Sequence, residues 1–191
     1  MKLRSFLLSG IVLAAVAGSG GCGREARDAE GGTPLLRAAE RGDLVRVRHL
    51  LLDRAEPEAV DRCHWTPLMK AALNGHAEVV DTLLAGGALT ETRDRAGYTA
   101  LMLAAQNGHV PAITRLLAAG AWIEAREPFR DTTALMLAAR GGHAAAVEAL
   151  LAAGADPAAT DRAGLRAAGH ALEAGHPQLA QRLADAGSQR H

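Results

Sequence analysis

Residues 94–109 read DRAGYTALMLAAQNGH, and this stretch decides the fold because close copies of it recur along the chain. Its threonine returns at intervals of 33, 33 and 34 residues, as Thr33, Thr66, Thr99 and Thr133, with Arg166 in the same slot 33 residues further on. Its glycine keeps the same step, as Gly42, Gly75, Gly108, Gly142 and Gly175. A fixed period in this range indicates a stack of supersecondary units rather than one globular core. It favours a partner-binding surface over an enclosed active site.

Each recurring residue has a local physical reason for its place. The threonine hydroxyl can accept a free backbone N–H at a helix start, and Pro34 or Pro67 fits the next position, where no N–H is needed. Paired alanines such as Ala104 and Ala105 allow helices to approach closely, and the glycine that follows suits a left-handed helix end. A second helix with one buried stripe is predicted by apolar residues at three-to-four spacing, as in Val79, Val80, Leu83 and Leu84.

The segments between helix pairs, such as residues 90–98, are short, polar and rich in Asp, Arg and Gly, which predicts hairpin-like projections. We interpret their aspartates, Asp61, Asp94 and Asp161, as turn formers rather than acid–base catalysts. Because one helix pair cannot bury its stripe alone, the end repeats of a stack should be atypical. The last outer helix meets this expectation with the polar residues Gln178, Gln181, Arg182 and Asp185.

The pattern resembles the ankyrin repeat family, whose signature runs Asp-x-x-Gly-x-Thr-Pro-Leu-His-x-Ala-Ala-x-x-Gly-His before an apolar helix that ends Leu-Leu-x-x-Gly-Ala. The resemblance implies an all-α, ankyrin-repeat solenoid of stacked helix-turn-helix units with short β-hairpin-like loops. We place this domain at residues 32–187 and expect a C-terminal tail at 188–191. The predicted repeats are 32–60, 61–93, 94–126, 127–160 and 161–187.

Residues 1–21 have the composition of an export signal. Lys2 and Arg4 precede an apolar run of about a dozen residues, from Phe6 to Ala17, and small residues follow. The run is shorter than the ~20 apolar residues that a transmembrane helix needs. The small-x-small sequence at residues 15–17 fits an ordinary signal peptidase, whose cleavage releases a soluble periplasmic protein.

A second form of export depends on Cys22. Gly20-Gly21-Cys22 resembles the end of a bacterial lipobox, although Ser19 stands where that pattern usually has an aliphatic residue. The resemblance implies a lipoprotein, with acyl chains on Cys22 as the membrane anchor and residues 22–31 as a flexible tether. The alternatives are an unmodified thiol and a disulfide with Cys63. We do not expect the disulfide, because it would tie a tail to a loop tip.

The composition excludes several classes of function. The chain has 21 basic and 21 acidic residues, and without Lys2 and Arg4 it has 19 basic residues, so we expect no nucleic-acid partner. Aromatic residues make up only 3%, which is typical of solenoids that pack with Ala and Leu. No Cys-x-x-Cys motif, Cys/His cluster or Gly-rich phosphate loop occurs, so we expect no metal and no cofactor.

Histidines recur in register at positions 76, 109, 143 and 176. Neighbouring helices pack about 8–10 Å apart, whereas zinc requires nitrogen at about 2 Å, so two successive histidines cannot share an ion. The family resemblance implies instead that each histidine orders the turn between helices through hydrogen bonds. A thiol-dependent enzyme using Cys63 and His64 is a third reading of the chain, but no third group is evident that would orient the imidazole. We expect no enzymatic activity.

The resemblance implies that a protein partner binds the hairpin tips and the exposed positions of the first helices. In this chain those positions are Arg62, Cys63, Trp65, Leu73, Asn74, Arg95, Ala96, Tyr98, Gln106, Asn107, Arg130, Thr132, Arg140 and Gly141. Trp65 and Tyr98 share one slot on successive tips, and aromatic residues beside arginines are typical of binding hot spots. Trp122 and Phe129 form a second apolar candidate, whose alternative role is packing across the insertion in the fourth repeat.

The arginines at 62, 95 and 162 share one register, which indicates an acidic partner unless each is neutralised by the aspartate before it. The function predicted from these features is a monomeric, non-enzymatic protein-binding module of the bacterial cell envelope. It would stabilise, mask or inhibit an exported partner. The alternative is a structural envelope scaffold without one tight partner.

Overall fold

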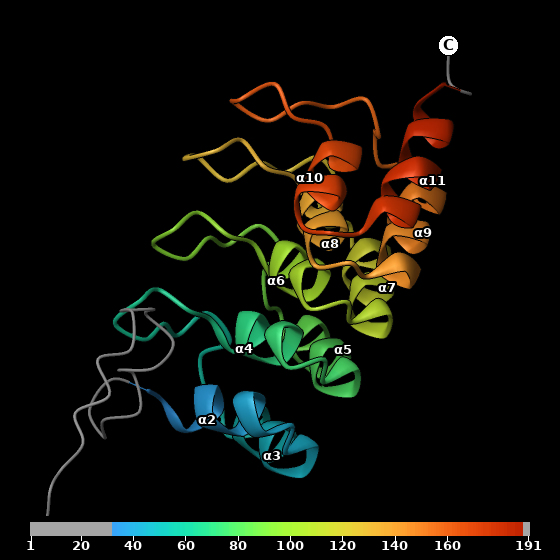
Figure 1. Ribbon diagram of the computed structural model, residues 1–191. Coiled ribbons are helices and arrows are strands. Elements are labelled where there is room, and N and C mark those ends of the chain that lie inside the picture. The colour runs from blue at the N-terminus through green and yellow to red at the C-terminus, as the bar shows by residue number, and fades with distance from the viewer. Residues whose placement is uncertain (1–31, 189–191) are drawn as a thin grey trace, which may run out of the picture.

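The chain forms an all-α solenoid over residues 32–188, the part that the computed structural model describes. Its helix pairs are α2 (Pro34–Arg41) with α3 (Leu44–Leu52), α4 (Pro67–Leu73) with α5 (Ala77–Ala85), α6 (Ala100–Gln106) with α7 (Val110–Ala118), α8 (Ala134–Arg140) with α9 (Ala144–Ala152), and α10 (Ala167–Glu173) with α11 (Pro177–Ser188). Figure 1 shows the pairs as successive layers whose connections project to one side. The predicted stack of helix pairs is confirmed.

Three predicted features fall outside these residues. They are the signal peptide at 1–21, the tether at 22–31 with Cys22, and the last three residues of the tail. Between residues 32 and 188 no strand is formed, only an isolated bridge that joins Thr160 to Arg166. No helix in the same range is long and apolar enough to cross a membrane.

A threonine hydroxyl starts the first helix of four pairs. The Oγ1 of Thr66 accepts the N–H of Met69 at 3.2 Å, and Thr33, Thr99 and Thr133 accept the same bond from the residue three positions on. Pro34 and Pro67 occupy the first helical position, as predicted. Arg166 makes no side-chain cap, so α10 begins without this bond.

The inner helices form the centre of the stack. Every residue of α6 from Ala100 to Ala105 is buried, and α4 and α8 are buried in the same way. The paired alanines are fully buried, and their small side chains allow each inner helix to contact the inner helix of the next layer. The outer helices α3, α5, α7 and α9 contact one another in the same order and bury one apolar stripe each.

A histidine joins each layer to the one before it. The Nε2–H of His109 donates to the carbonyl oxygen of Leu73 at 2.9 Å, and His76 and His143 donate to the carbonyls of Glu40 and Gln106. The ring lies against the glycine of the preceding layer, because a Cβ on Gly75 would come within 2.6 Å of the Nδ1 of His109. Each histidine therefore bridges two repeats. The prediction from the resemblance placed its hydrogen bonds only at the turn between helices.

The outer face carries ion pairs between layers. Arg115 on α7 bonds Asp81 on α5 at 2.5 Å, and Arg182 on α11 bonds Glu148 on α9. At the end of the stack, α11 buries Leu179, Ala180 and Leu183, while the predicted polar residues of its other side are exposed. The last helix therefore covers the core on one side and presents polar side chains on the other.

The contact between glycine and histidine predicts a stability difference between two substitutions. Gly75 has φ +72°, so Gly75→Ala strains the backbone and also forces the new Cβ against His109. Gly120 has φ +87° and no atom within 4 Å of its Cβ position, so Gly120→Ala strains the backbone alone. We expect Gly75→Ala to lower the free energy of unfolding by at least ~1 kcal/mol more than Gly120→Ala in urea titrations. Equal losses would show that the histidine contact contributes nothing.

Candidate functional site

Each connection turns back on itself around one acidic side chain. The Oδ1 of Asp94 accepts the N–H of Ala96 at 2.9 Å and of Tyr98 at 2.8 Å. Asp61 and Asp161 accept the same two bonds in their own connections. The prediction that these aspartates form turns is confirmed, and the carboxylates hold the tips in place of long strand pairing.

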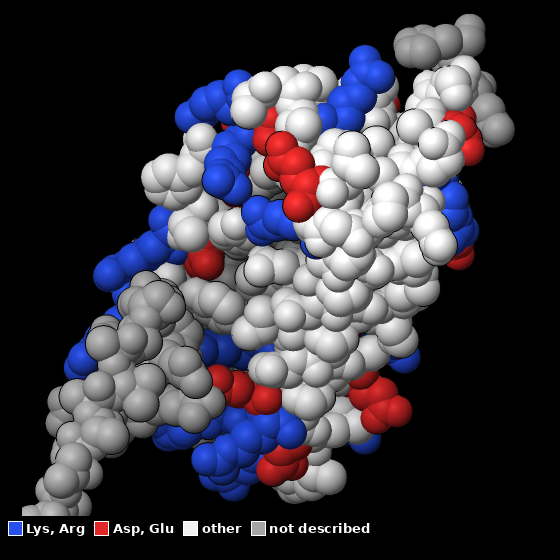
Figure 2. All heavy atoms as spheres, in the orientation of Figure 1, with Lys and Arg blue, Asp and Glu red and all other residues white. Residues whose placement is uncertain are grey.

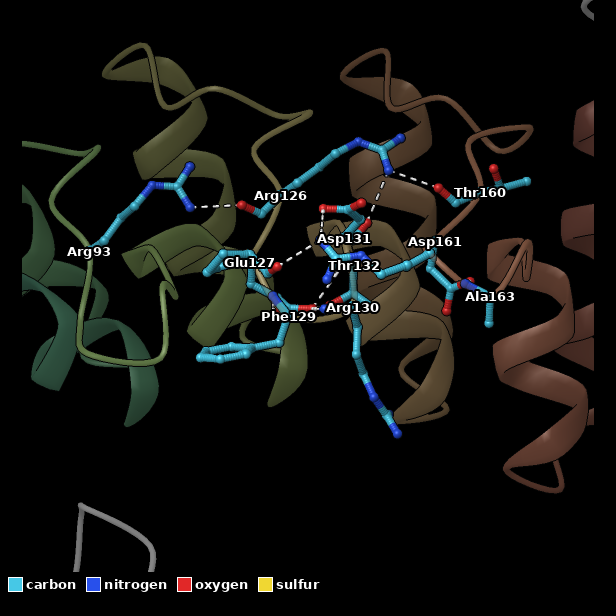
Figure 3. A network of polar contacts seen from close by, with 12 residues as sticks. Arg93, Arg126, Glu127, Phe129, Arg130, Asp131, Thr132, Thr160, Asp161 and Ala163 are labelled. Atoms are coloured by element: carbon cyan, nitrogen blue, oxygen red, sulfur yellow. Dashed lines mark hydrogen bonds and ion pairs between the residues drawn. The ribbon is translucent and has the colours of Figure 1, made fainter.

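The fourth tip reaches the same result with a different residue. Glu127 is buried, and its carboxylate accepts the N–H of Phe129 at 2.8 Å and of Arg130 at 2.7 Å, together with the N–H and hydroxyl of Thr132. The extra methylene of Glu spans the tip that has one inserted residue. Figure 3 shows this carboxylate at the centre of the tip. Sequence reasoning missed Glu127 because the inserted residue moves it out of the aspartate register.

A second set of bonds ties each tip to the next. The Nη1 of Arg93 donates to the carbonyl of Gly97 at 2.9 Å in its own connection and to that of Arg126 at 2.7 Å in the following one. Arg126 in turn donates to Asp131 and to Thr160, as Figure 3 shows. These two arginines were not among the predicted site residues, although their spacing of 33 was a signal that could have found them.

The predicted arginines differ from this bonding pair because their guanidinium groups are available. Arg62, Arg95 and Arg130 are exposed, and none of their side chains bonds to another described residue. Neutralisation by the preceding aspartate does not occur in the described residues, since Asp61 pairs with Lys70 at 3.4 Å instead. Figure 2 shows basic side chains along the edge where Figure 1 places the projecting connections.

Trp65 and Tyr98 are only half exposed and pack against the core. The Trp65 ring also covers the buried Nζ of Lys70, which lies 4.8 Å from the ring centroid. The two aromatic rings that sequence reasoning took as partner anchors therefore also support the tips on which they lie. By contrast, Phe129 and Trp122 are 65% and 60% exposed, so packing across the insertion does not bury them.

Two residues of the predicted partner surface are corrected by their burial. Thr132 is 1% exposed, because its hydroxyl turns inward to the carboxylate of Glu127. Cys63 is 8% exposed and disulfide-bonded, contrary to our expectation that it would not pair. A sulfur held in a disulfide cannot act as a nucleophile, which also removes the thiol of the predicted Cys63–His64 pair in this oxidation state.

The remaining predicted positions lie where the first helices end. Asn74 and Asn107 are exposed, and the Nδ2 of each donates to a carbonyl of its own helix. Gln106 and Gly141 are exposed, whereas Leu73, Ala96 and Arg140 are partly buried. Most of the predicted surface is thus accessible, but it is spread over three layers rather than gathered at one point.

A groove of about 670 Å³ lies between the last two connections and the inner helices beneath them. The argument below uses six of its lining residues: Phe129, Arg130, Arg140, Arg162, His170 and Glu173. Phe129 and Arg162 were outside the predicted site. The described residues contain no group of three or more His, Cys, Asp or Glu side chains that could hold a metal ion.

Asp94 and Asp161 occupy the same slot but have opposite electrostatic environments. Burial raises the pKa of Asp94 above its ordinary value, and the charge of Asp61 adds to the rise, although three N–H groups oppose it. Burial acts on Asp161 as well, but the N–H groups of Leu165 and Ala163 and the ring of His170, 3.0 Å away, outweigh it and lower the pKa. In the third repeat, Leu103 stands where the fifth repeat has His170.

The pKa of Glu127 is also lowered. Burial of this carboxyl favours its neutral form, but the N–H groups of Phe129, Arg130 and Thr132 and the Thr132 hydroxyl outweigh burial. The fourth tip is therefore held by an ionised carboxylate at neutral pH, as the second of its hydrogen-bonding roles requires no proton on either oxygen.

A model of ankyrin repeats, in three copies, matches this chain three times, over residues 8–94, 35–129 and 101–190. The chain belongs to the ankyrin repeat family. Ankyrin repeats generally mediate protein–protein interaction, and the proteins that carry them are typically non-enzymatic binding modules. No curated protein matches the chain. The ankyrin repeats and the accessible arginines together identify the projecting side of the solenoid as the candidate site.

The two aspartates predict opposite effects of the same substitution. The raised pKa of Asp94 means that its charge costs stability above that pKa, so Asp94→Asn should raise the free energy of unfolding at pH 7. The lowered pKa of Asp161 gives stability that is present above the unfolded pKa and lost as pH falls through the folded pKa. Asp161→Asn should therefore lower stability at pH 7, by about 1 kcal/mol or more.

Urea titrations at pH 7 and at pH 3 would measure both effects. The difference between each variant and the wild type should shrink at the lower pH, where the carboxylates become protonated. A loss of stability in Asp94→Asn at pH 7 would contradict this electrostatic account.

Proposed function

We propose that this ankyrin protein is an exported binding module of the bacterial cell envelope that grips an acidic region of one exported protein. Binding would be steric and non-covalent, and it would stabilise, mask or inhibit that partner. The observation that carries the proposal is the set of accessible guanidinium groups on tips whose backbone is already fixed. Arg62, Arg95 and Arg130 make no bond to the described residues, while the tips beneath them are held by buried carboxylates.

The fixed backbone favours a tight contact with one partner. Binding normally costs free energy because loops and side chains become ordered, and a preorganised surface reduces that cost. The bonds from Arg93 to Arg126 and from Arg126 to Thr160 also fix the spacing between neighbouring tips. A partner can therefore meet several tips at set distances. This supports a specific partner over a scaffold without one.

The proposed compartment is outside the cytoplasm. The basic and apolar start of the chain supports export, and so does the disulfide at Cys63, because disulfides persist mainly in oxidising compartments. An acyl chain and a disulfide cannot share one sulfur. A lipid anchor at Cys22 therefore excludes Cys22 as the partner of Cys63, and the two chemistries distinguish an anchored protein from a periplasmic one.

Charge reversal at the tips tests the binding function. A tagged chain expressed in its own cells would be cross-linked and purified from the envelope in three forms: wild type, Arg62→Glu/Arg95→Glu, and the control Arg46→Glu/Arg48→Glu. The control makes the same charge change on α3, where both arginines are exposed. We expect one protein to co-purify with the wild type and the control, and its recovery to fall at least ~10-fold with the tip variant.

Equal recovery of many envelope proteins by all three forms would favour the scaffold. Loss of the partner with the control variant as well would show that overall charge, rather than the tips, governs binding.

Intact-mass spectrometry of the purified protein tests export and the state of Cys22. Export predicts a processed chain with one of two masses: a chain cut after residue 17 with oxidised sulfurs, or a chain that begins at an acylated Cys22. Cys22→Ser should remove the acyl mass and move an anchored protein from the detergent phase to the aqueous phase. An unprocessed chain with two free thiols would contradict export.

A further inference from the structure

We propose that the groove between the last two connections holds an acidic, extended segment of the partner, with an apolar side chain of that segment packed on Phe129. This inference rests on the proposed binding function and gives it a location and a ligand class. The predicted anchors Trp65 and Tyr98 lie elsewhere, in the second and third repeats. They are partly occupied by packing against their own repeats.

The charges that face the groove are unbalanced. Arg130 and Arg140 make no side-chain bond within the described residues, and Arg162 makes a 2.9 Å bond to the carbonyl of Pro128 and a 3.6 Å contact with Asp131. Figure 3 shows the Arg130 side chain extending away from the polar network of its tip. Three guanidinium groups thus line one space, and two of them lack any partner on the protein.

The acidic residues of the groove do not compensate for these arginines. The carboxylate of Asp161 is 6% exposed and is already bonded to His170 and to the N–H groups of Ala163 and Leu165. Glu173 is the remaining acidic residue of the lining, and it is exposed. The groove therefore keeps a net positive charge, which favours a ligand that carries carboxylates.

The groove also has an apolar side. Phe129 is 65% exposed, and its ring points away from the network that holds its own backbone N–H (Figure 3). A large aromatic ring that is exposed on a fixed backbone is a typical anchor for a partner side chain. Leu165 and Ala163 extend the apolar lining next to it.

The spread of these groups favours a chain segment over a single small anion. The three arginines come from the fourth tip, the end of α8 and the fifth tip, and they line a space of about 670 Å³. Guanidinium groups bind carboxylates with two parallel hydrogen bonds, so separate arginines select separate carboxylates. An extended segment with acidic residues on both sides of an apolar one satisfies the arginines and Phe129 together.

Amide shift titrations with two short peptides test this proposal. The probes are Glu-Glu-Leu-Glu-Glu and the matched neutral peptide Gln-Gln-Leu-Gln-Gln, added to the isotope-labelled exported chain. We expect the acidic peptide to shift the amides of residues 129–130, 140 and 162–163, and to bind at least ~10-fold more tightly than the neutral one. Higher salt should weaken the acidic peptide selectively.

Substitutions locate the effect within the groove. Arg130→Glu/Arg140→Glu should weaken the acidic peptide at least ~10-fold, and Phe129→Ala should weaken it about 5-fold. The control Arg46→Glu/Arg48→Glu on α3 should leave its affinity unchanged. The exposure of these side chains predicts that all three variants keep the unfolding midpoint of the wild type, which the same samples can verify.

Three results would overturn the proposal. Inorganic phosphate that produces the same shifts at the same affinity would show a small-anion site. Equal binding of the neutral peptide would remove the charge argument. A dimer in sedimentation that Arg130→Glu/Arg140→Glu dissociates would show that the groove binds a second copy of this chain. If partner capture is lost in Arg62→Glu/Arg95→Glu but unchanged in Arg130→Glu/Arg140→Glu, the binding function stands and the groove does not take part.

Discussion

The contact between a histidine ring and the preceding repeat is the interaction on which the rest of this solenoid depends. Each ring donates to a carbonyl at the end of the previous inner helix and fills the space beside a glycine that has no Cβ. The bond satisfies a carbonyl that a short helix leaves without a partner. Because the same contact recurs in successive layers, it fixes how far each layer rotates against the next, and therefore where the tips lie.

The tips extend this order to the binding surface. Asp61, Asp94, Glu127 and Asp161 each replace strand pairing with bonds from a carboxylate to backbone N–H groups. Arg93 and Arg126 then join one tip to the next through carbonyl oxygens. The bonding arginines are used up inside the protein, whereas others of the same residue type remain accessible. Two roles of arginine, structural and partner-binding, thus alternate along the same connections.

Much of the fold followed from the sequence, and less of the surface did. The spacing of Thr99, Ala104 and Gly108 predicted the helix starts, the close packing and the helix ends, because each depends on one residue type and its near neighbours. The accessible surface was predicted less well. Thr132 was assigned to it from its register alone, and the inserted residue turned its hydroxyl inward to Glu127.

The sequence by itself determined the repeat, the helix pairs and the family, since a period of 33 residues is a one-dimensional signal that needs no contact between distant parts. Only the tertiary structure decided which arginines are bonded and which are accessible. Arg93 and Arg95 are two positions apart and chemically identical, yet one reaches a carbonyl 33 residues away and the other bonds to none of the described side chains. That difference arises from the stacking of layers, which brings together groups that local sequence does not relate.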